Sequence, residues 1–112
     1  RQIPLVGASL WAAQRIKSNT NNSPYAFTRY TSGKGTNANS ASAALNKWLK
    51  SRVPDGCVIH SFRHSLRDRL RAVQCPLDMI DQIGGWSTAS VGQGYGKGYD
   101  LALMQGYLEG IS

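Results

Sequence analysis

A histidine and an arginine stand three residues apart, at His60 and Arg63, at the start of a helical pattern of apolar residues. Residues three apart on a helix project from the same side, so an imidazole and a guanidinium would converge on one small target. A guanidinium grips two phosphate oxygens with a planar fork, and a histidine donates a hydrogen bond or moves a proton near neutral pH. The pair indicates a phosphate site, although a capped helix start with a surface arginine has the same spacing.

A second group of residues follows at Gly84-Gly85-Trp86, with Tyr95 nine residues after the tryptophan in a glycine-rich segment. A tyrosine with an ordinary pKa of about 10 is a poor nucleophile at pH 7 unless cations stabilise its phenolate and a mobile segment delivers it. The sequence supplies both requirements, with arginines as the cations and a glycine-rich segment that can deliver the tyrosine. Aromatic packing of Trp86 and Tyr95 is the competing interpretation.

Together, His60-x-x-Arg63, a short helix ending in Gly-Gly-Trp86, and Tyr95 resemble the C-terminal half of the catalytic domain of tyrosine recombinases, the phage integrase family. The order and spacings agree over nearly the whole chain. The resemblance implies site-specific DNA recombination and integration by strand cleavage and rejoining, with no cofactor and no external energy source. It also implies a bacterial or phage-encoded protein that acts at the nucleoid in the cytoplasm.

The resemblance gives each of the catalytic residues a role. Tyr95 would attack the scissile DNA phosphate and leave a 3′-phosphotyrosyl link with a free 5′-hydroxyl. Arg63 would bind the non-bridging oxygens, and His60 would assist proton transfer from the tyrosine. Trp86 stands where many members of the family have a second histidine, and its indole N–H donates a hydrogen bond without acting as an acid or base.

Two features of the family have no place in residues 1–112: an arginine on an earlier helix and a lysine on a β-hairpin that protonates the leaving 5′-oxygen. The chain is therefore interpreted as the C-terminal portion of a longer catalytic domain. A phosphate clamp without one arginine and the acid loses much of its transition-state stabilisation, so we expect negligible DNA cleavage by these residues alone.

The positive charge is concentrated in the first half of the chain. Thirteen Lys and Arg against six Asp and Glu give a net charge of +7, and residues 1–56 hold eight basic residues and one acidic residue. Such a one-sided field favours a polyanion, and we expect double-stranded DNA as the partner. The expected contacts to its backbone, which add affinity and salt dependence without reading sequence, are Lys34, Lys47, Lys50 and Arg52.

The spacing of apolar residues predicts a mainly α fold, a compact helical fragment with at most a short strand at residues 1–5. We expect helices over residues 8–16, from a cap at Asn39 or Ser40 to Arg52, and over 60–74, 77–83 and 101–111, with a surface connection over 18–39. The helix before Arg52 is expected to turn inward Ala44, Leu45, Trp48 and Leu49.

The last helix carries an apolar stripe that fits either its own core or a neighbouring protomer. The stripe consists of Leu101, Met104, Leu108 and Ile111. In the recombinase family this region exchanges between subunits of a tetramer on two DNA duplexes, so the resemblance implies a homo-oligomer that assembles through this helix.

Several alternatives stay open. Tyr99, four residues after Tyr95, competes as the nucleophile. Cys57 and Cys75 are interpreted as buried free thiols, although together with His60 and His64 they could be drawn as a zinc site that lacks a Cys-x-x-Cys pair.

Other function classes are weaker. The segment Thr31 to Thr36 is similar to a phosphate-binding loop but lacks the required first glycine. The sequence contains no run of about 20 apolar residues and no signal segment, so we expect no membrane insertion. The alternative functions are a non-catalytic DNA-binding remnant of an integrase and, third, an adaptor for an acidic protein.

Overall fold

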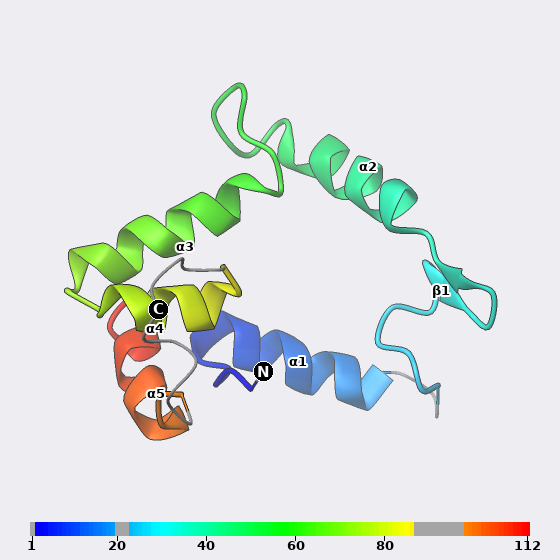
Figure 1. Cartoon of the computed structure of the whole chain (residues 1–112). Helices are drawn as coiled ribbons and strands as arrows, with labels where there is room; N and C mark the ends of the chain where they lie inside the picture. Colours follow the sequence, from blue (N-terminus) through cyan, green and yellow to red (C-terminus); the bar gives the residue numbers. More distant parts are fainter. Residues whose placement is uncertain (1, 20–22, 87–97) are drawn as a thin grey trace. The chain divides into compact units, whose positions relative to one another are not determined.

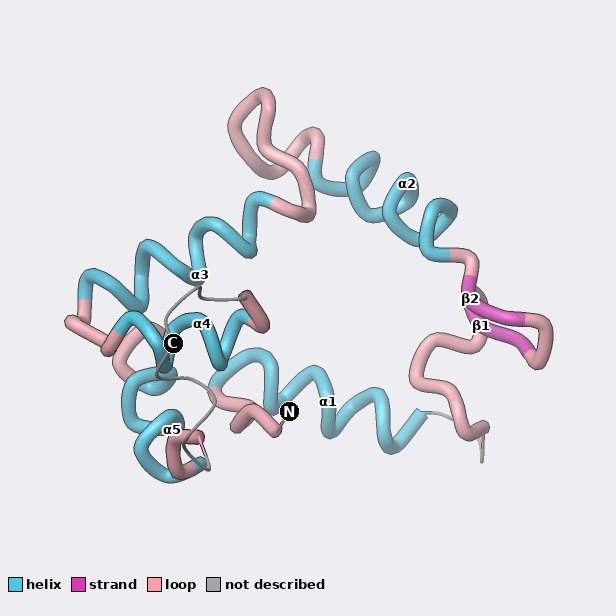
Figure 2. The backbone as a smooth tube through the Cα atoms, in the orientation of Figure 1, coloured by secondary structure: helices cyan, strands magenta, loops and turns pink. Residues whose placement is uncertain are grey.

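Five helices and one small hairpin make up the secondary structure of the computed structural model, which describes residues 2–19, 23–86 and 98–112 (Figure 1). The helices are α1 Gly7–Asn19, α2 Ala38–Leu49, α3 Ser61–Ala72, α4 Leu77–Gly84 and α5 Leu101–Glu109. The antiparallel hairpin pairs β1 Thr31–Ser32 with β2 Gly35–Thr36 (Figure 2). The prediction of a mainly α fold is confirmed.

The chain divides into two compact units. The first comprises residues 1–11 and 63–112, and therefore contains α4, α5 and nearly all of α3. The second comprises residues 12–62, with most of α1, the hairpin and α2. The boundary falls between Phe62 and Arg63, so His60 and Arg63 belong to different units.

The turn from α3 into α4 is closed by backbone hydrogen bonds. Gln74 adopts the left-handed conformation with φ of 58°, and the N–H of Cys75 donates to the carbonyl of Leu70 at 3.0 Å. The N–H of Gln74 donates to the carbonyl of Arg71 at 2.9 Å, which completes a Schellman motif. Pro76 follows as the N-cap of α4, where its lack of an N–H costs nothing.

The core of the first unit combines α3, α4 and α5. Its buried residues are Leu70, Cys75, Met79, Ile80, Ile83, Met104 and Leu108. Of the stripe expected on the last helix, Met104 and Leu108 pack into this core, whereas Leu101 is exposed. The part of α5 that is buried therefore packs on its own chain.

Four expectations are wrong. The only strand expected, at residues 1–5, is not formed by residues 2–6, where the Val6 carbonyl instead accepts the N–H groups of Ser9 and Leu10 at the start of α1, and the strands that the structure describes lie at 31–36. On α2, Leu49 is buried but Ala44 is exposed, as are Leu45 at 46% and Trp48 at 56%. The periodicity of apolar residues predicts which face of a helix is apolar, but that face is buried only where another element packs on it. The described residues do not cover the face of α2 that carries Leu45 and Trp48.

The third concerns Cys57. Both cysteines are free thiols, but Cys57 is exposed, because its N–H closes a tight turn onto the Pro54 carbonyl at 3.1 Å at the surface. Cys75 is buried as expected, and burial, followed by the charge of Asp78, raises the pKa of its thiol. A buried thiol with a raised pKa is a packing group rather than a nucleophile.

The fourth wrong expectation concerns the cap of α2, which lies before the residues expected for it. The Asn37 side chain accepts the N–H of Ser40 at 3.1 Å, and Asn39 already lies within the helix. Asn37→Ala is expected to lower the free energy of unfolding by about 1 kcal/mol, because an N-cap oxygen satisfies a backbone donor that would otherwise lack a partner. Chemical denaturation checks this value, with Asn39→Ala as the control. An equal loss in both variants would show that the cap is not at Asn37.

Candidate functional site

Two arginines of α3 meet the tryptophan that follows α4. Arg63 and Arg67 are four residues apart and therefore share one side of the helix. The Arg63 guanidinium lies 4.2 Å from the centroid of the Trp86 ring, and that of Arg67 lies 5.2 Å from it. The structure thus brings together Arg63 and Trp86, two of the residues that the sequence indicated for a phosphate site.

The glycine pair before Trp86 sets the position of the indole. Gly85 caps α4 in the left-handed conformation with φ of 66°, which L side chains rarely adopt. The N–H groups of Gly85 and Trp86 both donate to the carbonyl of Asp81, the latter at 3.0 Å. A Cβ atom on Gly84 would overlap the Trp86 ring. One glycine is required for the turn, and the other for the close approach of the ring.

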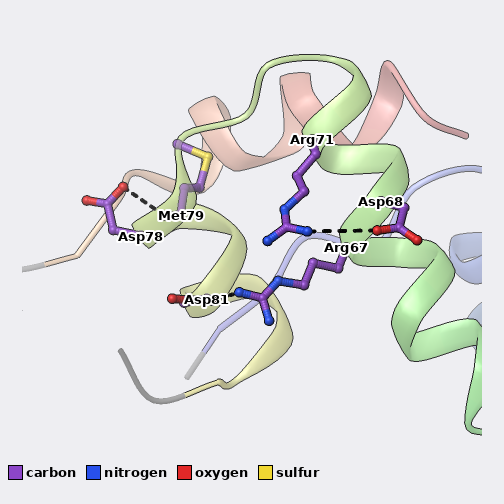
Figure 3. Close-up of polar contacts among 6 residues, drawn as sticks. All are labelled: Arg67, Asp68, Arg71, Asp78, Met79 and Asp81. Atoms are coloured by element: carbon purple, nitrogen blue, oxygen red, sulfur yellow. Dashed lines mark hydrogen bonds and ion pairs between the residues drawn. The ribbon is translucent and has the colours of Figure 1, made fainter. Parts of the chain in front are cut away.

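A buried carboxylate holds Arg67 from α4. Asp81 is 2% exposed, and its Oδ1 lies 3.6 Å from Nη2 of Arg67, whose side chain is 33% exposed (Figure 3). Neither residue was indicated by the sequence as part of the site. A signal was present, because Asp81 interrupts the apolar residues of α4, Met79, Ile80 and Ile83, on the helix that ends in the glycine pair.

Arg63 differs from Arg67 in its electrostatic environment. Arg63 forms no ion pair with any residue that the structure describes, whereas the charge of Arg67 is opposed by Asp81. The guanidinium of Arg63 stacks on the indole, and it donates no hydrogen bond to a residue in the part of the chain that the structure describes. Guanidinium N–H groups of this kind are suited to an anion. The indole N–H of Trp86 is a further donor of the kind that an oxyanion accepts.

The other two predicted catalytic residues are not placed in this site. His60 is exposed and immediately precedes α3, in the second unit of the chain. Tyr95 lies outside the described residues. Of the four predicted catalytic residues, the structure therefore places only Arg63 and Trp86 together among the residues that it describes.

Tyr99, the alternative nucleophile, is held by α4. Its hydroxyl donates to Oδ2 of Asp78 at 2.7 Å, and its backbone N–H donates to Oε1 of Gln82 at 3.0 Å. The hydrogen bond to Asp78, followed by partial burial, raises the pKa of Tyr99 above its ordinary value. Phenolate is then even scarcer at neutral pH, which argues against Tyr99 as the attacking group.

Asp78→Asn is expected to lower the pKa of Tyr99 toward 10, because the variant removes the carboxylate that accepts the hydroxyl hydrogen bond and whose charge opposes the phenolate. Since the folded-state pKa is raised, the contribution of this contact to stability is complete below pH 10 and is lost as the pH rises through the folded-state pKa. Alkaline titration of tyrosinate absorbance, with Tyr99→Phe subtracted, measures the shift. A Tyr99 titration that is the same with and without the Asp78 carboxylate would contradict this account.

The residues expected to contact the DNA backbone all lie in the second unit and are exposed. They are Lys34, Lys47, Lys50 and Arg52. Lys34 lies in the turn of the hairpin, and Arg52 donates to the Trp48 carbonyl at 2.7 Å and stacks on its ring at 4.3 Å. Seven Lys and Arg and one Asp occur between residues 12 and 62, a net charge of 7 − 1 = +6. Most of the excess positive charge therefore belongs to this unit.

The remaining alternatives find little support in the geometry. In the described parts of the chain, no three His, Cys, Asp or Glu side chains gather where they could hold a metal ion. Thr31 to Thr36 forms the hairpin rather than a loop between a strand and a helix. None of the described helices has the length and apolar character needed to cross a bilayer.

Comparison with known proteins identifies no relative. No protein-family model, no curated protein and no solved structure matches the chain.

Proposed function

We propose that the chain binds a phosphodiester of double-stranded DNA at Arg63 and Trp86. In its parent protein it would cleave and rejoin DNA as a tyrosine recombinase, through a 3′-phosphotyrosyl intermediate on Tyr95. The observation that carries the proposal is the Arg63 guanidinium stacked 4.2 Å over the Trp86 ring without an ion-pair partner among the described residues. A fixed cation beside an indole N–H suits a phosphate that gains charge in a transition state.

The proposed reaction exchanges one phosphodiester for another. The Tyr95 oxygen forms a bond to phosphorus while the bond from phosphorus to the 5′-oxygen breaks, so no external energy source is needed. His60 takes part in removing the tyrosine proton, and an acid from the upstream part of the parent protonates the leaving oxygen. Arg63 and Trp86 stabilise the non-bridging oxygens throughout.

The basic second unit supports DNA as the substrate. Its net charge of +6 and the exposed side chains of Lys34, Lys47, Lys50 and Arg52 suit sequence-independent contacts to phosphates. The proposal includes further copies of the chain as partners, assembled on DNA at the bacterial nucleoid. The exposed Leu101 and Leu103 of α5 are apolar groups that such an assembly could cover.

The proposal is tested with the chain and whatever upstream sequence its gene encodes, incubated with nicked duplexes that trap covalent intermediates. Peptide mapping is expected to find the adduct on Tyr95, absent in Tyr95→Phe and retained in Tyr99→Phe. Salt-sensitive DNA binding without an adduct over a broad set of sites would instead favour a non-catalytic DNA-binding protein. Absence of DNA binding would contradict both.

A further inference from the structure

Asp81 places a charge in an apolar layer. It is 2% exposed, and Ile80 and Ile83 beside it belong to the core. A buried carboxylate is costly even when it is paired, and apolar replacement of a buried ion pair is often neutral or stabilising. Stability alone does not account for a carboxylate at this position of α4.

Asp81 acts on Trp86 through two different groups. Its backbone carbonyl accepts the N–H of Trp86 at 3.0 Å, which fixes the backbone where the indole begins. Its carboxylate pairs with Arg67, whose guanidinium lies 5.2 Å from the ring centroid. Both the backbone and the ring of Trp86 therefore depend on one residue.

The ion pair also separates the roles of the two arginines. The charge of Arg67 is opposed by the carboxylate of Asp81 at 3.6 Å, although the Arg67 side chain stays 33% exposed. Arg63 has no such acidic partner in the described chain. An anion that approaches the indole therefore meets Arg63 as the uncompensated cation.

We propose that Asp81 and Arg67 are positioning residues that hold the Trp86 indole in place and leave Arg63 as the phosphate ligand. This inference rests on the proposed function, because it assigns the supporting residues of the same phosphate site. It differs from a purely structural role in predicting that phosphate binding fails while the fold persists.

The test follows the indole N–H resonances of the three tryptophans in the whole chain by NMR, with the Trp86 signal assigned by Trp86→Phe. Asp81→Asn is expected to move the Trp86 signal, because Arg67 loses the carboxylate that holds it beside the ring. Binding of inorganic phosphate is compared in the double variant described below, which removes both charges of the ion pair, and is expected to weaken there by about fivefold, the change that corresponds to one net hydrogen bond. Asp68→Asn is the matched control, because it removes the exposed ion pair with Arg71 (4.0 Å, Figure 3) and is expected to change neither.

A double variant, Asp81→Leu with Arg67→Leu, separates positioning from folding. It is expected to keep the signals of Trp11 and Trp48 while the Trp86 signal moves and phosphate binding weakens. If it does not fold, Arg67→Lys serves instead, because a lysine keeps the charge but has no planar group to lie over the ring. The same displacement of the Trp86 signal is expected.

The outcomes are distinguishable. Phosphate that leaves the Trp86 signal of the wild-type chain unmoved would contradict the proposed function. A wild-type response to phosphate that persists unchanged in the double variant, or a Trp86 signal that Asp81→Asn leaves in place, would overturn only the role of Asp81 and Arg67.

Discussion

Arg63→Ala is expected to slow formation of the covalent DNA adduct by about 100- to 1,000-fold, or about 2.7–4 kcal/mol of transition-state stabilisation. The reason is local. Arg63 is the arginine at the indole without an opposing carboxylate among the described residues, so under the proposed function its removal takes away the main cation of the phosphate site. Single-turnover adduct formation on a nicked duplex, by the chain together with whatever upstream sequence its gene encodes, measures the effect, with DNA binding recorded separately.

Arg71→Ala is the matched control for Arg63. Arg71 lies on the same helix and carries the same charge, but it is exposed and pairs with Asp68 at 4.0 Å. Its removal is expected to lower DNA affinity slightly and to leave the rate at saturating DNA unchanged, because a surface ion pair is worth little. Equal losses of rate in both variants would mean that the effect reflects total charge and not a site at Arg63.

Gly84→Ala is expected to lower the free energy of unfolding by about 1–3 kcal/mol, the usual cost of forcing extra atoms into a packed site. The added Cβ would overlap the Trp86 ring, and Gly84 is itself buried, so the indole must leave its place. Chemical denaturation measures the loss of stability. The indole N–H resonance of Trp86 reports whether the ring has moved away from Arg63 and Arg67.

Gly106→Ala makes the same chemical change as Gly84→Ala but is expected to change the free energy of unfolding in the opposite direction. Gly106 lies within α5, and a Cβ built on it meets no atom within 4 Å. Alanine there is expected to raise the free energy of unfolding by about 0.5–1 kcal/mol, because glycine loses more backbone freedom on entering a helix. A stable Gly84→Ala variant with an undisturbed Trp86 signal would refute the close-packing role given to that glycine.

Local pattern in the sequence was enough to predict the helices. Each depends on neighbours within a few residues, through apolar spacing in α3 and α5, and through Pro76 and the glycine pair at the two ends of α4. The sequence also indicated Arg63 and Trp86 as members of one catalytic set, because their residue types and order resemble a known catalytic motif. Neither inference required knowledge of which elements pack together.

Tertiary structure decided what the sequence left open. The apolar face of α2 stays exposed at Leu45 and Trp48, because burial depends on whether another element covers it. Asp81 and Arg67 come from different helices, and only the turn between α3 and α4 makes them an ion pair. The spacing of residues predicts which side chains share one face of a helix. It does not predict the different environments of Arg63 and Arg67 on α3, because these depend on the Asp81 carboxylate of α4.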